Sequence, residues 1–346
     1  MSLPTIDISP FLNPSSTAAS RKQTAQAINT ACTQYGFFYL TNHGIPTATQ
    51  DHIISLARSF FALPLSQKLQ IKRHDAGGPE GGDGARGYQP MGDNVTAGRR
   101  DMHEAVDWYR EWDHAAKTEG SGGKGTSAPL QGTNLWPSEP TDLKDVYEEY
   151  VKQVLTVGEA VVRAMGVAIA LLCNGEGEVD DEVFVKSTDM SFWVMRMIGY
   201  PKLSSSVAPS ESGSTAADME NEFSCGEHTD YGCITLLLTD PTPGALQVLH
   251  KDGQTWINAD PIPGAFVVNI GDMMERWTNG LWKSTKHRVI HRGDGYRVSV
   301  PFFYEPNFDA VVEPLGACVR KSGREPVHQG STYGEHLLGK VLSNFY

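Results

Sequence analysis

The second half of the chain is a succession of short apolar segments, and this pattern constrains the fold more than any other. From Met190 onward, runs rich in Val, Ile, Leu and Phe are separated by turns that contain Gly or Pro, which is typical of antiparallel strands. Such strands commonly stack as two sheets in a jelly roll, whose mouth can hold a metal. The predicted strands are Phe192 to Ile198, Ile234 to Leu238, Leu246 to Leu249, Ala265 to Ile270, His287 to His291 and Arg297 to Tyr304.

The first half of the chain carries helical patterns instead. Ser20 to Tyr35 and Asp51 to Leu63 place apolar residues at helical spacing, and Val146 to Leu172 predicts one long amphipathic helix. Phe37 to Leu40 is predicted as a strand. The expected fold class is therefore α+β, with a double-stranded β-helix (jelly-roll) core and flanking helices.

Three residues of the strand-rich half, His228, Asp230 and His287, have side chains that bind metals. Two imidazoles and one carboxylate can occupy one face of an octahedral Fe(II) and leave three positions open for substrate and oxygen. Taken alone, a His-x-Asp pair on one strand face more often forms only hydrogen bonds, and sequence spacing does not place His287 nearby. The three residues are candidate ligands whose proximity the fold must supply.

An arginine and a serine follow the second histidine at a spacing that suits an anion site. Arg297 lies ten residues after His287, and Ser299 follows two residues later. Residues two apart on a strand point the same way. A guanidinium binds a carboxylate through two hydrogen bonds, which a lysine cannot do. The pair therefore predicts an anchor for an anionic co-substrate beside the metal.

The candidate ligands lie within longer ordered motifs. The metal-site half contains the runs Gly226 to Gly232, Gly271 to Met273, Trp277 to Gly280 and Ser284 to Val289. The N-terminal part contains Leu3 to Asp7, Gly36 to Leu40 and Asn42 to Pro46. In these runs the chain resembles the Fe(II)/2-oxoglutarate-dependent dioxygenases, more narrowly their isopenicillin N synthase-like branch. The resemblance covers nearly the whole chain, with gaps near 113–135 and 203–222.

The resemblance implies an organisation and a role for each candidate. An N-terminal dioxygenase region (1–135) would pack on a helix, jelly-roll core and C-terminal segment (136–346) as one compact unit. His228, Asp230 and His287 would hold Fe(II) and form the catalytic centre. Arg297 and Ser299 would bind the distal carboxylate of 2-oxoglutarate, whose other end chelates the metal.

Three further residues are expected at the site, and one histidine is expected to have no special role. Tyr200 matches a tyrosine that often donates a hydrogen bond to the co-substrate in this branch. Arg196 shares its strand face, where related enzymes use an arginine near the substrate or co-substrate. Phe303 is expected in the cavity wall. His103 has no motif around it and is expected to be an ordinary polar residue.

The resemblance implies oxidation of a substrate coupled to conversion of 2-oxoglutarate and O2 into succinate and CO2, with ascorbate as an optional stimulant. Hydroxylation is the default outcome, while desaturation, ring closure or ring expansion would need only a differently placed substrate radical. Three alternatives remain open: a same-scaffold Fe(II) oxidase that does not use 2-oxoglutarate, a zinc hydrolase, and a non-catalytic jelly-roll binding module.

The substrate is the least constrained part of the prediction. Aromatic and aliphatic residues in the expected lining, 88–103 and 329–338, predict a free small molecule that is neutral or weakly acidic, such as an aromatic secondary metabolite. The stretches 75–87 and 119–132 are predicted loops. The segment 203–222 is either a linker or a lid over the cavity.

Composition bounds the partners and the compartment. A net charge of −12 without a basic stripe disfavours nucleic acid as a partner. Five cysteines without a Cys-x-x-Cys pair predict a reduced, cytoplasmic setting. No signal peptide or membrane-spanning run is evident. We expect a monomer or a weak homo-oligomer.

Overall fold

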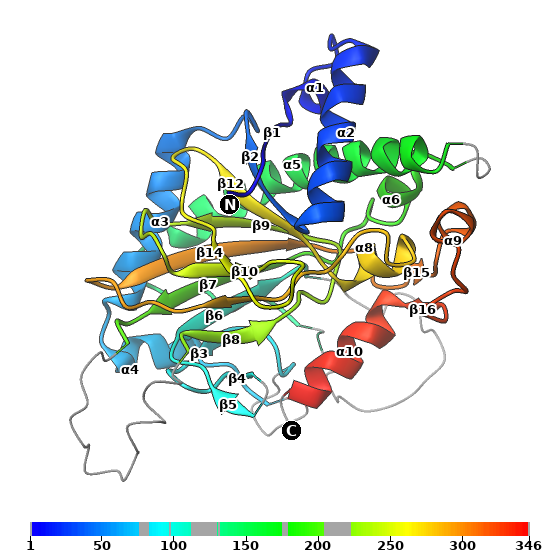
Figure 1. Ribbon diagram of the computed structural model, residues 1–346. Coiled ribbons are helices and arrows are strands. Elements are labelled where there is room, and N and C mark those ends of the chain that lie inside the picture. The colour runs from blue at the N-terminus through cyan, green and yellow to red at the C-terminus, as the bar shows by residue number, and fades with distance from the viewer. Residues whose placement is uncertain are drawn as a thin grey trace, which may run out of the picture.

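The computed structural model describes residues 2–75, 83–96, 98–111, 130, 132–174, 179–203 and 223–344. Its framework is two β-sheets, with the order β1-β2-β12-β9-β14-β7-β6-β3 in the larger and β11-β10-β13-β8 in the smaller (Figure 1). This arrangement confirms the predicted α+β jelly-roll fold. Most of the two predicted loops at 75–87 and 119–132, and almost all of the lid or linker segment at 203–222, lie outside the described residues.

The strands of the larger sheet come from both halves of the chain. They are β1 (Thr5–Asp7), β2 (Phe37–Thr41), β3 (Gly87–Gln89), β6 (Glu104–Tyr109), β7 (Val194–Tyr200), β9 (Ile234–Thr239), β12 (Phe266–Ile270) and β14 (Arg297–Tyr304). The smaller sheet contains β8 (Cys225–His228), β10 (Leu246–Leu249), β11 (Trp256–Asn258) and β13 (His287–Val289). Two pairs of short antiparallel strands complete the sheets: β4 (Val95–Thr96) with β5 (Arg99–Arg100), and β15 (Val311–Val312) with β16 (Ser331–Thr332).

The longer helices lie outside the sheets. They are α2 (Ala18–Gln34), α3 (Thr47–Phe61), α5 (Leu143–Leu172) and α10 (Tyr333–Asn344). Short helices connect them: α1 (Ser9–Leu12), α4 (Leu65–Lys68), η1 (Leu69–Ile71), α6 (Val183–Lys186), α8 (Asp272–Trp277) and α9 (Gly316–Ser322). In Figure 1, α2, α3 and α5 lie on one side of the larger sheet, and α10 runs separately near the C-terminus.

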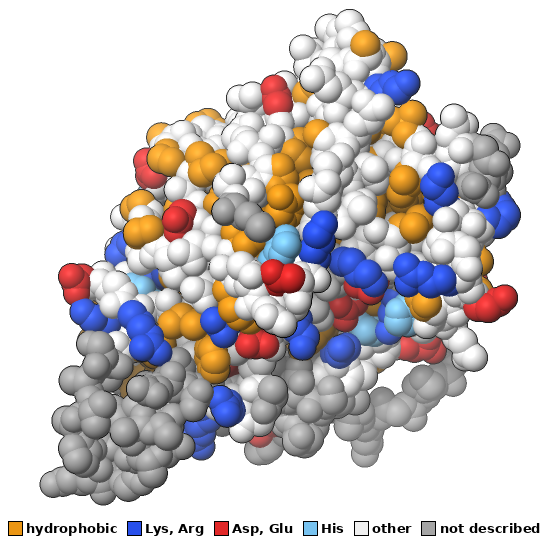
Figure 2. All heavy atoms as spheres, viewed as in Figure 1, with side chains coloured by type: hydrophobic (Ala, Val, Ile, Leu, Met, Phe, Trp, Pro, Cys, Tyr) orange, Lys and Arg blue, Asp and Glu red, His pale blue; other side chains and the backbone are white. Residues whose placement is uncertain are grey.

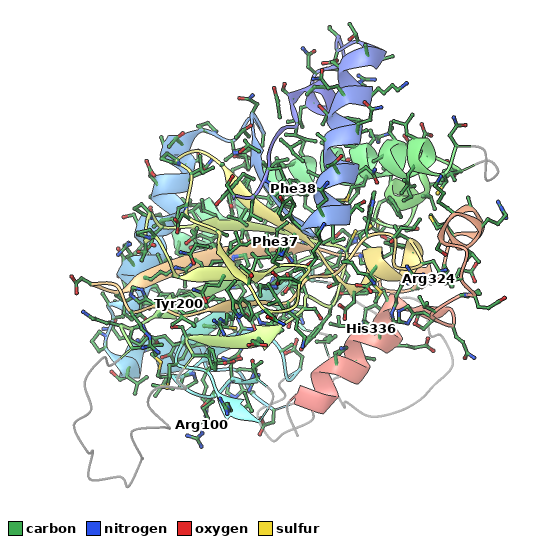
Figure 3. The ribbon with its side chains drawn as sticks, in the orientation of Figure 1. Phe37, Phe38, Arg100, Tyr200, Arg324 and His336 are labelled. Atoms are coloured by element: carbon green, nitrogen blue, oxygen red, sulfur yellow. The ribbon has the colours of Figure 1, made fainter. Side chains whose placement is uncertain are left out.

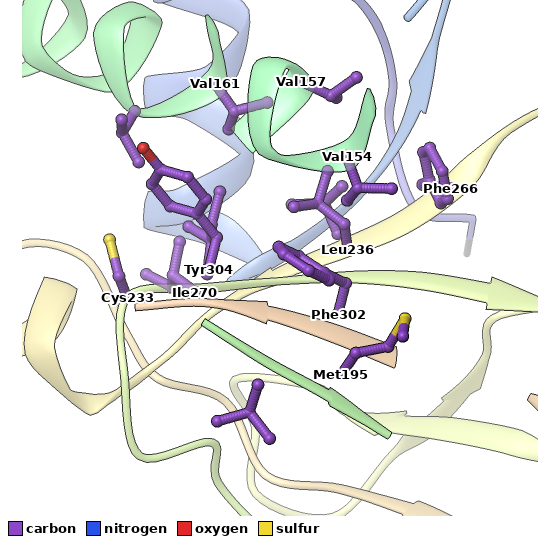
Figure 4. Packing of buried hydrophobic residues seen from close by; sticks show 14 of the residues in the cluster. Val154, Val157, Val161, Met195, Cys233, Leu236, Phe266, Ile270, Phe302 and Tyr304 are labelled. Atoms are coloured by element: carbon purple, nitrogen blue, oxygen red, sulfur yellow. The ribbon is translucent and has the colours of Figure 1, made fainter. Parts of the chain in front are cut away.

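The hydrophobic core lies between α5 and the larger sheet. Figure 4 shows Val154, Val157 and Val161 of α5 above Phe302 and neighbouring strand residues. Gly158 permits this close approach, because a Cβ there would lie 2.3 Å from the Tyr304 ring. By length and composition α5 could cross a membrane, but 61% of its most apolar window is buried inside the protein. Its apolar surface is therefore largely used for core packing.

Alternation along three neighbouring strands separates this core from a cavity on the opposite face. On β14, even-numbered residues such as Phe302 and Tyr304 join the α5 core, whereas Phe303 and the following Glu305 line the cavity. On β6, Val106 and Trp108 join the core and the odd-numbered residues face the other way. Alternation of this kind follows from the period of two in strand side chains. It brings polar residues of β6, β7 and β14 to one surface.

Two of the differences from the sequence predictions have a clear physical reason. α3 begins at Thr47 rather than at Asp51, because Pro46 starts the helix and its carbonyl accepts a hydrogen bond from Gln50 N at 3.2 Å. The first turn is polar, so apolar spacing did not reveal it. β6 was not predicted as a strand at all. Its two carboxylates make the run look exposed, although every residue of β6 is buried.

On the surface, basic and acidic side chains are interspersed over the face seen in Figure 2. The full sequence has 41 Asp and Glu against 29 Lys and Arg, and side chains of both signs are visible on this face.

Candidate metal and co-substrate site

The three candidate ligands converge where two antiparallel strands meet. β13 pairs with β8 so that His287 lies opposite His228, and their imidazole centroids are 4.2 Å apart. Asp230 follows β8, and its Oδ1 lies 3.7 Å from His228 Nε2 and 3.5 Å from His287 Nε2. One ion between these atoms would contact all three. Strand register therefore supplies the proximity that sequence spacing left open.

Both histidines are oriented by hydrogen bonds on the side away from the metal position. Nδ1 of His228 lies 2.8 Å from the Gly226 carbonyl oxygen, and Nδ1 of His287 lies 3.2 Å from that of Thr285. Because a carbonyl only accepts, each Nδ1 carries the proton and each Nε2 lone pair is free for a metal. Phe37, labelled in Figure 3, packs edge-on against His287 at 5.2 Å and further fixes its ring.

The carboxylate of Asp230 is held just as firmly. Its Oδ2 accepts hydrogen bonds from Asn269 Nδ2 at 2.6 Å and from the Thr235 hydroxyl. Burial alone would raise the pKa of Asp230, but His287, His228 and these two hydrogen bonds lower it below its ordinary value. Oδ1 is therefore an ionised ligand atom that faces the histidines.

The donor set fits Fe(II). Two imidazole nitrogens and one carboxylate oxygen form the facial set typical of non-haem Fe(II) oxygenases. These ligand atoms all lie within 4.8 Å of one another. When bound, the iron supplies the oxidising chemistry, and the protein holds the three ligands in place.

Arg297 forms a buried cationic site at the start of β14. Its Nη2 donates to Thr239 Oγ1 at 2.9 Å, and its guanidinium lies 4.8 Å from the centroid of the Tyr200 ring. The hydroxyls of Ser299 and Tyr200 are 3.4 Å apart. The register of β14 with β7 explains this grouping, because Arg297 pairs with Tyr200 and Ser299 with Ile198. The structure therefore brings the three predicted co-substrate residues together.

This site fits the carboxylate of 2-oxoglutarate. Arg297 is only 2% exposed, yet its Nε and Nη1 are buried without a hydrogen-bond partner. A buried cation with unpaired N–H groups is costly unless an anion joins it. Two hydroxyls beside the guanidinium, on Ser299 and Tyr200, can donate further hydrogen bonds to that anion.

A cavity of about 440 Å³ opens beside the metal ligands. It is lined by Asn94, Val95, Thr96, Asp101, His103, Asp107, Tyr109, Val194, Arg196, Cys225, His228, Thr229, Asp230, Tyr231, Lys286, Phe303, Glu305, Tyr333, Leu337 and Lys340. Arg196 and Phe303 are among these lining residues, as we expected from the sequence. The hairpin β4–β5, the strand β6 and the helix α10 supply much of the remaining lining.

The lining is more highly charged than the sequence led us to expect. Glu305 is 4% exposed, and its Oε2 accepts a hydrogen bond from Cys233 N at 2.8 Å. Among the described residues, no lysine, arginine or histidine forms an ion pair with it. Burial raises the pKa of Glu305 to about 8. Gly232 makes room for this carboxylate, because a Cβ there would lie 1.2 Å from Glu305 Oε2.

His103 lies in the cavity lining, as expected for 88–103, but it is not the ordinary polar residue that the sequence predicted. It is 2% exposed, its Nδ1 lies 2.7 Å from the Ser224 carbonyl oxygen, and its Nε2 has no hydrogen-bond partner. Burial lowers the pKa of His103 to about 3, so the ring is neutral. With Asp101 and Cys225 it forms a second group of potential ligands, but both Asp101 oxygens already accept hydrogen bonds, from Gly226 N and Thr96 Oγ1. We therefore regard His103 as a cavity residue rather than a metal ligand.

Sequence reasoning missed the residues that support and complete the site. Thr235, Thr239 and Asn269 reach it through the pairing of β9 with β14 and β12. Asn94, Asp107 and Glu305 lie outside the recognised motifs. Buried carboxylates in an otherwise apolar stretch, as in β6, were the only available signal.

Comparison with known proteins agrees with this geometry. Residues 3–139 match the family model described as non-haem dioxygenase in morphine synthesis N-terminal, and residues 209–306 match that of the 2OG-Fe(II) oxygenase superfamily. The chain is 41% identical to homoarginine-6-hydroxylase 2-ODD-C23.1 of Arabidopsis thaliana, covering 99% of this chain and 98% of the relative. The corresponding soybean (Glycine max) protein, homoarginine-6-hydroxylase 2-ODD-C23, is 40% identical over 99% of this chain and 97% of its own length.

Solved structures give the same assignment. The crystal structure of a full-length Neurospora crassa protein in complex with alpha-KG and thymine superimposes with a TM-score of 0.75 at 28% identity. The match covers 99% of this chain and 96% of that one. Motifs, geometry and relatives agree that this chain belongs to the 2-oxoglutarate/Fe(II)-dependent oxygenases, as a dioxygenase that hydroxylates small molecules and uses Fe(II) and 2-oxoglutarate.

Proposed function

We propose that this dioxygenase hydroxylates a guanidino amino acid of the L-homoarginine type. Relatives about 40% identical over almost the whole chain bear the name homoarginine-6-hydroxylase. Such a substrate carries a guanidinium at one end and an ammonium and a carboxylate at the other. A cavity that receives it needs charges of both signs.

The observation that carries this proposal is the charge of the cavity. Glu305 presents a buried carboxylate without a cationic partner among the described residues, and Asp107 lies nearly buried in the same lining. Arg196 contributes a cation to that lining. A buried carboxylate is stabilised when a cation joins it, and the guanidinium of the substrate is the cation that we assign to Glu305.

The protein's residues would divide the work between two ends of the site. Arg297, Ser299 and Tyr200 hold the distal carboxylate of 2-oxoglutarate away from the substrate. The charged cavity orients the carbon chain of the substrate beside the metal position. Exclusion of water by the bound substrate would protect the reaction from unproductive turnover.

This proposal replaces the neutral or aromatic molecule expected from the sequence. A neutral ring would leave Glu305 without a counter-ion in the cavity. That the substrate is a secondary metabolite stays a prediction. A natural product with charged groups would also pair with the charged side chains of the cavity. Action in the cytoplasm, as a monomer or a weak homo-oligomer without nucleic-acid or membrane partners, is part of the same proposal.

Succinate release from 2-oxoglutarate tests the proposal. The purified protein with Fe(II) and O2 would be given L-homoarginine, L-arginine, L-lysine or thymine, each at equal concentration. We expect the largest stimulation with L-homoarginine and little with thymine. Stimulation by thymine and none by any of the basic amino acids would contradict the proposal.

A further inference from the structure

Four buried polar atoms without hydrogen-bond partners converge on the cavity. They are Asn94 Nδ2, His103 Nε2, Asp107 Oδ1 and Arg196 Nε. Buried polar groups in folded proteins are nearly always paired, so unpaired groups in one cavity indicate where a ligand binds. Two of these residues, Asp107 and Arg196, lie directly opposite each other on β6 and β7.

The four atoms comprise two donors and two acceptors. Asn94 Nδ2 and Arg196 Nε are donors, and Asp107 Oδ1 is an acceptor. His103 is an acceptor as well, because its Nδ1 proton is directed to the Ser224 carbonyl oxygen. Arg196 Nε and Asp107 Oδ1 form an ion pair at 3.2 Å, but without the geometry of a hydrogen bond. Both atoms are therefore available to a polar ligand.

Other polar atoms of these side chains form hydrogen bonds, which fixes their orientation. Arg196 Nη2 donates to Asn94 Oδ1 at 2.8 Å, and Gln89 Nε2 donates to Asp107 Oδ2 at 2.5 Å. Gln89 lies on β3, and its Oε1 is 3.4 Å from Arg196 Nη2, so this side chain contacts residues of both β6 and β7. Groups that are held in this way lose little entropy when a ligand binds.

We propose that these four residues bind the α-amino-acid head group of the substrate. The carboxylate of that head group would accept hydrogen bonds from Arg196 Nε and Asn94 Nδ2. Its ammonium would donate to Asp107 Oδ1 and His103 Nε2. This inference rests on the proposed function, and it adds which end of the substrate binds at which end of the cavity.

The position of Glu305 agrees with this orientation. Because Ile198 pairs with Ser299 and Met195 with Phe302, Arg196 lies at the level of Pro301. Glu305 follows four residues later, which corresponds to about 13 Å at 3.3 Å per strand residue. The head group and the guanidinium of an extended long-chain amino acid can therefore bind separate charged groups. The metal ligands His228 and Asp230 line the same cavity.

Two substrate analogues, each without one charged group of the head group, test the binding of the ammonium and of the carboxylate separately. The analogue 6-guanidinohexanoate lacks only the amino group of L-homoarginine, and 5-guanidinopentylamine lacks only its carboxylate. For the wild-type enzyme, we expect kcat/KM to fall roughly 10- to 100-fold for each analogue, since each loses hydrogen bonds to charged groups. Product formation and succinate release would both be measured.

Two variants then test the assignment of each part. Asp107→Asn should remove most of the preference for L-homoarginine over 6-guanidinohexanoate and keep the preference over 5-guanidinopentylamine. Asn94→Ala should reduce the preference for L-homoarginine over 5-guanidinopentylamine, which lacks the carboxylate, and keep the preference over 6-guanidinohexanoate. The control is Asp83→Asn, which breaks another buried Asp–Arg pair, with Arg86, outside the cavity lining. It should leave both preferences unchanged.

The outcomes separate the two proposals. If wild-type enzyme hydroxylates L-homoarginine but uses both analogues equally well, the head-group site is wrong and the proposed function stands. Unchanged preferences in both variants would also overturn the head-group site. If wild-type enzyme does not hydroxylate L-homoarginine, the proposed function fails and this inference fails with it. Thermal unfolding of each variant shows whether it is folded. If Asp107→Asn does not fold, the result for Asn94→Ala decides whether the head-group site is correct.

Discussion

The metal and co-substrate end of the site differs from the charged end of the cavity in how the chain builds it. At the first end, three ligands and an arginine come from three short runs, 226–232, 284–289 and 297–299, on or beside strands of both sheets. At the second end, residues from 94 to 340 meet across a hairpin, two strands and a helix. The first arrangement is fixed by strand register and needs few residues. The second arrangement depends on how elements far apart in the sequence pack together. Its residues can therefore vary while the chemistry at the metal stays the same.

The two ends also differ in how completely their polar groups are paired. Asp230 receives two hydrogen bonds on the oxygen that faces away from the histidines, so its position is fixed before metal binds. In the cavity, four buried atoms have no hydrogen-bond partner, and Glu305 has no cation among the described residues. Hydrogen-bonded groups hold the metal ligands, whereas groups without such partners, including Arg297, are left to bind the ligands. Substitutions at the two ends should therefore have different effects.

The largest effect is expected at the metal ligands. His287→Ala or Asp230→Ala should abolish hydroxylation and strongly weaken Fe(II) binding, because two ligands do not hold the facial geometry. Binding of Fe(II) by the purified variants and succinate release would be measured together. His250→Ala, at a histidine that pairs with Asp252 outside the site, is the control and should behave like the wild type. Full activity in His287→Ala would refute the assignment of the ligands.

A smaller but still large effect is expected at the co-substrate anchor. Arg297→Ala removes the partner of a buried carboxylate, which costs about 3–5 kcal/mol, or roughly a few hundred- to several thousand-fold in affinity for 2-oxoglutarate. Arg297→Lys should restore only part of this affinity. Arg163→Ala, at a partly exposed arginine of α5 that pairs with Glu159 and Glu182, should leave that affinity unchanged. An unchanged KM for 2-oxoglutarate in Arg297→Ala would mean that another residue anchors the acid.

Residues that support the ligands should matter less than the ligands themselves. Asn269→Ala removes a hydrogen bond of 2.6 Å to Asp230 Oδ2. Loss of such a contact typically lowers metal affinity or activity by about 10- to 100-fold. Titration with Fe(II) should therefore need a higher concentration for half-maximal activity. If affinity and activity both match the wild type, the Thr235 hydroxyl alone is enough to orient Asp230.

The smallest effect is expected at Glu305, and it should depend on pH. Burial raises the pKa of Glu305 to about 8. The other groups that influence this pKa belong to Cys233, Asp230, Tyr333 and Asp272, and none of them is a cation. A cationic substrate binds the ionised form, so kcat/KM for L-homoarginine should rise with pH and level off above about 8. Glu305→Gln should lower kcat/KM on the order of 10-fold and remove this rise. A wild-type pH profile that is retained in Glu305→Gln would exclude Glu305 as the group responsible.

The same carboxylate gives a stability test with a defined sign. The folded-state pKa of Glu305, about 8, lies above its ordinary value of 4.5. The folded protein therefore binds more protons than the unfolded chain in this range, and stability from this group is lost as the pH rises from 4.5 to about 8. Glu305→Gln should show a weaker loss of thermal stability across that window. An equal loss in both proteins would assign it to other groups.

The sequence predicted the first end of the site far better than the second. The spacing of Arg297 and Ser299 on one strand face was sufficient to place both side chains together, and Tyr200 joined them through strand pairing. Strand β6 was not predicted, because the charge of Asp107 is typical of an exposed segment although the strand is buried. His103 looked ordinary, because its role depends on a missing hydrogen-bond partner that only three-dimensional structure reveals. Glu305 gained its role from burial, which no local pattern indicates.

The central claim is that one site couples 2-oxoglutarate conversion, anchored at Arg297, to hydroxylation of a substrate with charged groups at both ends. Its most direct test is the stoichiometry of succinate and hydroxylated product when wild-type enzyme acts on L-homoarginine with Fe(II) and O2. We predict equal amounts of the two products, and no hydroxylated product when 2-oxoglutarate is left out. Hydroxylation without 2-oxoglutarate, or succinate formed with no hydroxylated homoarginine, would contradict the account.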